Sequence, residues 1–289
     1  MTKKTLLITG GSGYLGWHLG SKAADLFNLY VTYRSQSAEI TAGKPVFLDL
    51  TNRGEVQRTV AKIKPDAIIH AAAINPGKGD EQLMMHVNVD GSRYVAEAAV
   101  AVGARLVHVS TDVVHDGKHA PYADDAPPSP LNAYGRSKAA AEAAVIEVAP
   151  QAAIVRTSLI YGLEKMDRGT EGFVARLNAG EKLVLFDDVI RQPVWVDSLA
   201  GALLKLVNLD FSGTLNVAGR QALTREDFAR RMLQWWGVDA QALGNIESGK
   251  AADISSTIPL DLRLSVSKAE QLLQMRRPGV DEVISGATG

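Results

Sequence analysis

The stretch that decides the fold is TLLITGGSGYLGWHL, residues 5–19. Its first five residues are apolar or β-branched without alternation, which is typical of a strand buried on both faces. Glycines then follow at three-residue intervals before an apolar helical pattern. Such glycines allow a tight turn, let the backbone approach a pyrophosphate, and let helix and strand pack closely. The free N–H groups at the helix start favour an anion. The stretch therefore predicts a dinucleotide-cofactor site that includes Gly10, Gly13, Tyr14, Leu15 and Gly16.

Strand and helix signals alternate along the next part of the chain. Strands are expected at 30–34, 45–48, 67–70, 105–110 and 152–157, and helices at about 15–27, 53–63, 81–102 and 135–148. This alternation predicts βαβ units with right-handed crossovers and a doubly wound parallel sheet, which is the α/β Rossmann fold.

The pattern becomes irregular after Gly162. Residues 163–172 are polar and expected to be mobile, whereas 194–209 and 214–218 are expected to return to the main sheet. A helix near 225–236 is expected to begin at the N-cap Thr224 and to stop at Gly237. We expect a Rossmann domain at 1–162, rejoined by 193–219, and a smaller interleaved substrate-binding lobe at 163–192 and 220–289.

Composition excludes several classes of function. The 289 residues carry a net charge of -1, which offers no basic surface to nucleic acid or to an anionic membrane. No cysteine is present, so disulfides and thiolate chemistry are excluded. No apolar run approaches the roughly 18 residues of a membrane span. His70, His86, His108, His115 and His119 lack a ligand spacing with paired carboxylates, so no metal is expected. We expect a soluble cytoplasmic protein.

Residues after the second and fourth strands bear on the choice of cofactor. An acidic residue after the second strand would bond the ribose 2′-hydroxyl of NAD, but the chain has Arg34 and Ser35 there. An arginine can pair with a 2′-phosphate, so NADP is predicted, with NAD as the other option. A solvated surface arginine is the alternative reading of Arg34. Small side chains at Ala71, Ala72 and Ala73 let the backbone approach a cofactor, although they also fit an ordinary packed alanine run.

The segment LNAYGRSKAAAE, residues 131–142, carries the predicted chemical centre. Tyr134 and Lys138 are four residues apart and therefore share one face of a helix. They follow the strand that ends in Ser110-Thr111-Asp112. A free tyrosine has a pKa of about 10, and a neighbouring ammonium stabilises its phenolate. This pair, inside a dinucleotide-binding pattern, predicts proton transfer by a tyrosine.

With this glycine spacing and this Tyr-Lys pair, nearly the whole chain resembles the extended short-chain dehydrogenase/reductases. The resemblance implies hydride transfer between nicotinamide and a carbonyl or alcohol carbon. It assigns Tyr134 as the acid/base, Lys138 as the residue that tunes it and bonds the nicotinamide ribose, and Thr111 as the orienting hydroxyl in preference to Ser110. It also places Asp49 and Leu50 beside the adenine. Asn88 is either a functional asparagine of a water relay or a plain structural hydrogen-bonding residue.

Within that group the chain resembles the dTDP-4-dehydrorhamnose reductases. The likeness rests on STDVVHDG at 110–117, the acidic pair and prolines at 124–130, and RTSLIYG at 156–162. It implies reduction of a keto group on a nucleotide-linked sugar, a homodimer, and the substrate-binding residues Asp112, Leu159 and Arg191. The chain departs from this family at Leu159, where a tryptophan is common, and at His115, which replaces an aromatic residue. RQPVWVDSLA at 191–200 is closer to the epimerase pattern, in which the arginine binds nucleotide phosphate; a surface salt bridge is the alternative.

Three other functions are weighed against this one. A dehydratase would need a proton-transferring residue where Val113 stands. A sugar-nucleotide epimerase of the same fold retains NAD and carries an acidic residue after the second strand, which Arg34 replaces. A non-catalytic NADP-binding regulatory subunit stays open, although intact Tyr134, Lys138 and Thr111 favour an enzyme.

Overall fold

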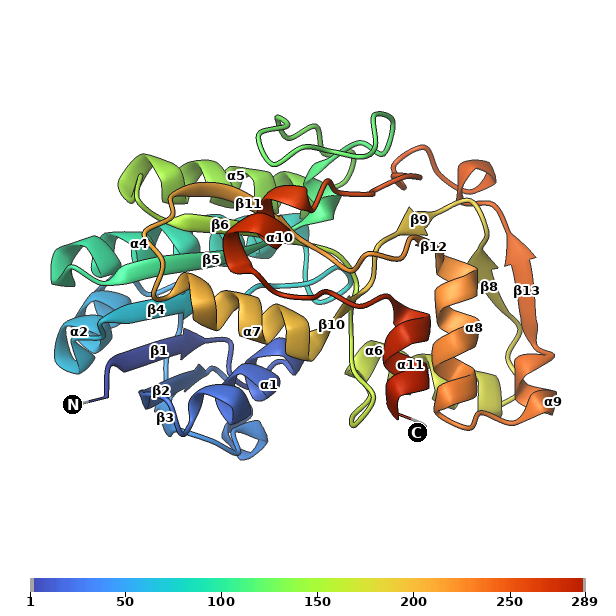
Figure 1. The fold of residues 1–289 in the computed structure, drawn as a ribbon, viewed down its shortest axis with the longest axis horizontal. Coiled ribbons are helices and arrows are strands. Elements are labelled where there is room, and N and C mark those ends of the chain that lie inside the picture. The colour runs from blue at the N-terminus through green and yellow to red at the C-terminus, as the bar shows by residue number, and fades with distance from the viewer. Residues whose placement is uncertain (1–2, 288–289) are drawn as a thin grey trace.

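The computed structural model describes residues 3–287, in which seven parallel strands form the central sheet in the order β11-β6-β5-β4-β1-β2-β3 (Figure 1). The chain builds outward from β1 to β3 and then returns to the other side of β1 at β4. This reversal creates a switch point at the carboxyl ends of β1 and β4, where open α/β sheets bind ligands. The predicted doubly wound parallel sheet is confirmed. The strand bounds are β1 Thr5–Thr9, β2 Asn28–Tyr33, β3 Lys44–Phe47, β4 Ala67–His70, β5 Arg105–Thr111, β6 Ala153–Thr157 and β11 Gly213–Val217.

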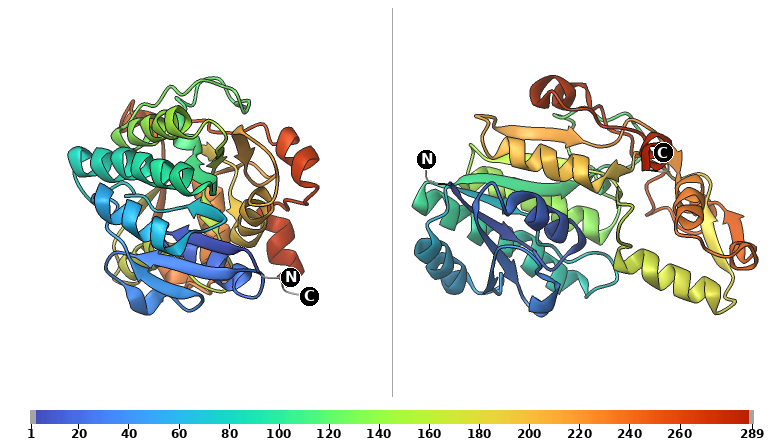
Figure 2. Two further views of the ribbon diagram at one scale, coloured as in Figure 1. Left: turned by 90° about the vertical axis from the view of Figure 1, so that its left-hand side faces the viewer. Right: turned by 60° about the horizontal axis from the view of Figure 1, so that its bottom comes forward.

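Helices cover both faces of this sheet (Figures 1 and 2). Leu6 and Ile8 of β1 belong to one cluster of buried side chains, and Leu7 between them belongs to the other. Because both faces are covered, β1 needs apolar residues without alternation. One face carries α2 Arg53–Ile63, α4 Gly91–Val102 and α5 Ala133–Val148, and the other carries α1 Tyr14–Ala23, α7 Val196–Leu206 and α10 Ser267–Leu273.

A second, smaller lobe lies to the right in Figure 1. Its core is a cluster of buried leucines that includes Leu177, Leu185 and Leu233. Three two-stranded ladders hold it: β8 pairs with β13, β9 with β12, and β10 with β7. The bounds are β7 Ile160–Tyr161, α6 Arg168–Asn178, β8 Leu183–Phe186, β9 Ile190–Arg191, β10 Val194–Trp195, β12 Leu223–Thr224, α8 Arg225–Trp235, α9 Ala240–Leu243, β13 Ile246–Gly249 and α11 Val280–Ala287.

The segment 194–209, expected to return to the main sheet, adds a helix to its face and no strand to its edge. Only β10 is extended, and it pairs with β7 outside the main sheet. Residues 196–206 form α7 instead, because Leu199, Leu203 and Leu206 recur at helical spacing and are fully buried. This helix packs against α1 and covers the sheet, and β11 is the later segment that extends it.

Two other segments differ from the expected pattern. The helix expected over 81–102 is divided into α3 Glu81–Met85, a wider π-helical turn at His86–Asp90, and α4. The polar segment 163–172, expected to be mobile, enters α6 at Arg168, where Asp167 caps the helix by accepting from the Gly169 and Thr170 amides. Between residues 3 and 287 the structure contains no helix long and apolar enough to cross a membrane.

Candidate active site

The glycine turn brings three pieces of backbone into contact at the switch point. Gly10 has a φ of 75°, and a Cβ there would lie 2.7 Å from the Cα of Ala72. A Cβ at Gly16 would lie 2.2 Å from the Gly10 carbonyl oxygen. The cap residue of α1, Gly13, offers no side-chain acceptor, and its first turn has no acidic residue within the described chain. The N–H groups at the start of α1 are therefore open to an anion, which fits a pyrophosphate.

Tyr14 and Leu15, also predicted at the cofactor site, point in different directions. Leu15 is buried in the core beneath the sheet. The Tyr14 hydroxyl donates to the carbonyl oxygen of Lys165 at 3.1 Å, and a Cβ on Gly162 would lie 2.5 Å from that hydroxyl. Tyr14 thus joins the glycine turn to the second lobe.

The residues predicted at the adenine end lie at the carboxyl ends of β2 and β3. Arg34 and Ser35 are exposed, and Arg34 Nε lies 3.6 Å from a carboxylate oxygen of Asp49. Asp49 also accepts from the amide and the hydroxyl of Thr51, at 2.9 and 2.7 Å. Leu50 is buried, and a Cβ on Gly91 would lie 3.0 Å from its side chain. The exposed guanidinium of Arg34 is accessible to a phosphate.

A buried histidine supports the alanines after β4. Ser92 Oγ donates to the Asn88 carbonyl at 2.6 Å, so it must accept from His70 Nε2, 2.9 Å away. His70 Nδ1 then accepts from the Thr9 hydroxyl at 2.6 Å. Burial, aided by the charge of Lys138, lowers the pKa of His70 to about 3, so the ring is neutral. Residues 71–73 are half-buried and directly follow His70, the last residue of β4, whose ring these hydrogen bonds hold in place.

Lys138 is buried on the helix that carries the predicted chemical centre. Helix α5 begins where Asn132 accepts from the Gly135 amide at 2.9 Å, which places Tyr134 and Lys138 on its first turns. The buried Lys138 ammonium donates to the Val109 carbonyl oxygen at 2.8 Å. Burial lowers the pKa of Lys138 to about 8, and the charge of Glu142 opposes this shift. The ammonium is therefore still mostly protonated at neutral pH.

Tyr134 and Thr111 come together at the end of β5. Burial raises the pKa of Tyr134 to about 12, and the Asp112 carboxylate adds to the shift. The Arg191 charge and a hydrogen bond from Thr111 oppose it. The hydroxyl of Ser110 does not bond Tyr134, because it donates to the buried carboxylate of Glu142. The geometry thus favours Thr111 over Ser110 as the hydroxyl beside Tyr134, and Tyr134 is a neutral proton donor.

Asp112 and Arg191 form a buried ion pair next to this centre. Arg191 donates from Nε and Nη2 to the two carboxylate oxygens of Asp112, at 2.8 and 2.5 Å. Asp112 is fully buried and Arg191 is 8% exposed. The arginine is therefore neither a surface residue nor a free cation.

Asn88 makes the hydrogen bonds of a structural residue. Its side-chain oxygen accepts from the Ile74 amide at 2.7 Å, and its nitrogen donates to the Ile74 carbonyl at 3.1 Å and to Ser137 Oγ at 3.0 Å. Ser137 in turn donates to the Tyr134 carbonyl at 2.8 Å. Both N–H groups of the amide are thus used. Asn88 ties α5 to the loop after β4.

A cavity of about 370 Å³ opens between the two lobes. Leu159 and Tyr14 contribute to its wall, so one predicted substrate residue and one predicted cofactor residue meet there. Tyr134 and Lys138 lie outside this lining. Its apolar and aromatic wall is formed mainly by the second lobe, including Tyr161, Met166, Phe173, Leu185, Phe228, Met232, Leu233 and Trp236.

Arg225 lines the same cavity and was missed by sequence reasoning. Leu223 pairs with Arg191 in the β12–β9 ladder, which brings Arg225 close to the ion pair. Arg225 is exposed as a whole residue. Desolvation of its guanidinium lowers the pKa of Arg225, and the nearby charge of Arg191 lowers it further. The Asp112 carboxylate opposes both effects. The available signal was a cation at the first position of a helix, where the helix dipole disfavours it.

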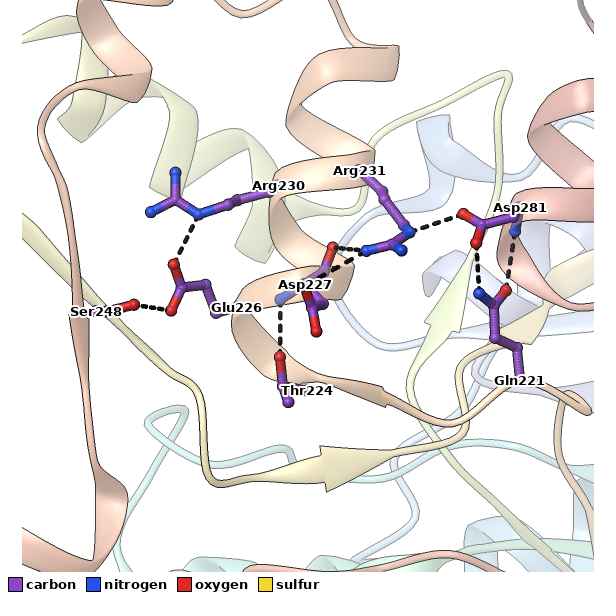
Figure 3. A network of polar contacts seen from close by, with 8 residues as sticks. All are labelled: Gln221, Thr224, Glu226, Asp227, Arg230, Arg231, Ser248 and Asp281. Atoms are coloured by element: carbon purple, nitrogen blue, oxygen red, sulfur yellow. Dashed lines mark hydrogen bonds and ion pairs between the residues drawn. The ribbon is translucent and has the colours of Figure 1, made fainter.

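The charged residues that follow Arg225 in the first turns of α8 form pairs that do not include it (Figure 3). Glu226 accepts from Arg230 and from Ser248. Thr224 caps the Asp227 amide at 3.0 Å, as the sequence predicts, and Arg231 bridges to Asp281. Among the described residues, Arg225 has no hydrogen-bonding or ion-pair partner for its guanidinium. It is a cation open to a ligand in the cavity.

Comparisons with known proteins agree with this arrangement. A family model described as the RmlD substrate binding domain matches residues 4–286. The chain is 33% identical over 259 residues to a dTDP-4-dehydrorhamnose reductase of Mycobacterium tuberculosis, covering 85% of this chain and 80% of that protein. It is 32% identical over 255 residues to a dTDP-4-keto-6-deoxy-D-glucose reductase of Streptomyces niveus, covering 85% and 83%.

A solved structure of a protein with the same named activity also matches nearly the whole chain. The dTDP-4-dehydrorhamnose reductase of Bacillus anthracis, in complex with NADP, is 26% identical and has a TM-score of 0.83, over 99% of this chain and 98% of that one. The chain therefore belongs to the RmlD family of NAD(P)-dependent oxidoreductases, within the extended short-chain dehydrogenase/reductases, as its sequence resemblance predicts.

Proposed function

We propose that this protein is an NADPH-dependent reductase of a keto group on a nucleotide-linked sugar. The observation that carries the proposal is Tyr134, a neutral proton donor beside Thr111 at the carboxyl end of β5, on the same helix as Lys138, whose buried ammonium donates to the Val109 carbonyl. This arrangement suits protonation of an oxygen that becomes negative during reduction.

The cofactor proposal rests on the glycine turn and on Arg34. The open N–H groups at the start of α1 fit a pyrophosphate, and Gly10, Gly13 and Gly16 leave room for it. Arg34 and Ser35 are exposed where a 2′-phosphate would lie. The related reductase of Bacillus anthracis binds NADP, which supports the same cofactor here. When bound, NADPH supplies the hydride.

In this mechanism the protein's own residues position the substrate oxygen and move a proton to it. Thr111 hydrogen-bonds the oxygen beside Tyr134, and the Tyr134 hydroxyl donates its proton as negative charge develops there. Lys138 then stabilises the phenolate that remains until solvent reprotonates it. A high pKa for free Tyr134 favours the protonated form that reduction needs.

The substrate proposal rests on the cavity and on Arg225. An aromatic and apolar wall suits a nucleotide base, and the guanidinium suits a diphosphate at the end nearest Asp112. Arg191 is committed to Asp112, so we assign the phosphate contact to Arg225 and a supporting role to Arg191. Leu159 forms part of the wall in place of an aromatic side chain. The proposed substrate-binding lobe is 163–192 and 220–289 without α10, which packs on α7 and β11 of the Rossmann domain.

The test is turnover of NADPH with a panel of nucleotide-linked 4-keto sugars, followed by loss of NADPH absorbance. We expect oxidation of NADPH in stoichiometric proportion to alcohol formed. Conversion of a sugar to its epimer with tightly retained NAD would support the epimerase instead. Reduction of simple ketones alone would remove the sugar assignment, and binding of NADPH without any turnover would favour a regulatory subunit.

A further inference from the structure

The segment that leads from β7 into α6 crosses to the N-terminal lobe. Lys165 is held there by the bond from Tyr14 to its carbonyl, and its ammonium lies 5.6 Å from the centre of the Trp17 ring. Its Nζ also forms an ion pair with Glu39 at 3.2 Å. The crossing therefore brings a cation of the second lobe onto the loop that follows β2.

Arg168, at the start of α6, reaches the same loop. Its Nη2 donates to the side-chain oxygen of Gln36 and lies 3.6 Å from a carboxylate oxygen of Glu39. Gln36 directly follows Arg34 and Ser35, the residues assigned to the 2′-phosphate. Two cations from one lobe thus lie beside the cofactor-discriminating residues of the other.

These two cations reverse the sign of the local charge. Within the N-terminal lobe, Arg34 is paired with Asp49, and Glu39 adds a further negative charge, so these three groups sum to -1. With Lys165 and Arg168 included, the cluster sums to +1. A phosphate monoester carries roughly -1.5 to -2 at pH 7. The N-terminal residues alone would repel it, whereas the completed cluster attracts it.

We infer that Lys165 and Arg168 complete the 2′-phosphate site of Arg34 and Ser35 and are specificity-determining residues for NADPH over NADH. The inference rests on the proposed use of NADPH. The side chains of Lys165 and Arg168 are 42% and 54% exposed, and that of Glu39 is 38% exposed. Ion pairs at this exposure are weak, so the two cations exchange readily between Glu39 and a phosphate.

The test compares the wild type with the double variant Lys165→Gln/Arg168→Gln by isothermal titration calorimetry. The ligands are NADPH, NADH and adenosine 2′,5′-bisphosphate, which carries the 2′-phosphate without the nicotinamide. We expect the affinity for NADPH and for the bisphosphate to fall by about tenfold or more, as loss of charge-assisted hydrogen bonds implies, with NADH binding unchanged.

A matched control is Arg176→Gln/Lys182→Gln. It removes the same charge from the same lobe, where these residues pair with Glu181 and Glu247. We expect this variant to bind all three ligands like the wild type. An unchanged ratio of NADPH to NADH affinity in the Lys165/Arg168 variant, or an equal loss in the control, would overturn the inference while leaving the proposed cofactor in place. Equal affinities for NADPH and NADH in the wild type would instead overturn the proposed cofactor, and the inference with it.

Discussion

Arg191 donates two hydrogen bonds to Asp112. The pair joins β9 of the second lobe to the end of β5, because Asp112 directly follows Thr111. Both side chains are almost completely removed from solvent. The bridge therefore fixes the end of β5, where Thr111 meets Tyr134, relative to the lobe that lines the cavity.

Replacing Asp112 by Asn should destabilise the protein strongly. The substitution keeps the shape of the side chain but leaves the Arg191 charge buried without a carboxylate, which costs about 3–5 kcal/mol. Urea unfolding measures the loss. The exposed Asp125 gives the control, because Asp125→Asn should change the free energy of unfolding very little. A similar small change in both variants would mean that the pair is not needed for stability.

Removing the hydroxyl of Tyr134 should abolish most turnover and leave the fold intact. We expect Tyr134→Phe to lower kcat by about 10²–10⁴, the usual contribution of a positioned proton donor. Binding of NADPH should stay close to that of the wild type, which calorimetry can check. A kcat near the wild-type value would place the proton transfer elsewhere.

The reduction rate should fall in alkaline solution because of Lys138. Its ammonium is present below its pKa of about 8 and is lost above it, so kcat should be level near pH 7 and decline as the pH rises past 8. Tyr134 does not cause this decline, because its pKa of about 12 lies far above that range. In Lys138→Arg the cation persists, and the decline should disappear at a lower overall rate. An identical decline in that variant would assign it to another group.

Arg225 should act on substrate affinity rather than on the chemical step. With Arg225→Gln, a lost charge-assisted contact to phosphate of about 1.5–3 kcal/mol would raise KM roughly ten- to a hundredfold, with kcat nearly unchanged. Arg230→Gln is the control, because that arginine lies on the same helix but pairs with Glu226 (Figure 3). If both variants keep the wild-type KM, the phosphate contact lies elsewhere.

Local signals in the sequence predict much of the Rossmann sheet. The expected strand 67–70 and the expected helix 53–63 coincide with β4 and α2. The strand is a short run of buried apolar residues, and the helix has a capping residue, Asn52, before its first turn. Each signal depends only on neighbours in the chain. The Tyr134–Lys138 spacing is of the same kind, since one helix sets it.

The parts that sequence reasoning missed depend on distant contacts. Arg191 and Asp112 are 79 positions apart, so no local pattern distinguishes their buried pair from a phosphate-binding arginine. Arg225 reaches the cavity only because β12 pairs with β9. The leucines of residues 196–206 recur at helical spacing, but the packing of this helix on α1 joins residues far apart in the chain and has no local signal.

The order in which the chain visits the two lobes has a consequence for folding. It leaves the sheet after β6, builds part of the second lobe, and returns with α7 and β11. It then adds β12 to β13 to the second lobe, packs α10 on the sheet, and ends in α11 of the second lobe. A fragment that stops at residue 162 would lack α7, whose buried leucines pack against α1 in the core on one face of the sheet, and would lack the strand that protects the outer side of β6. Neither lobe is therefore an autonomous folding unit, and the protein should lose both in a single cooperative transition.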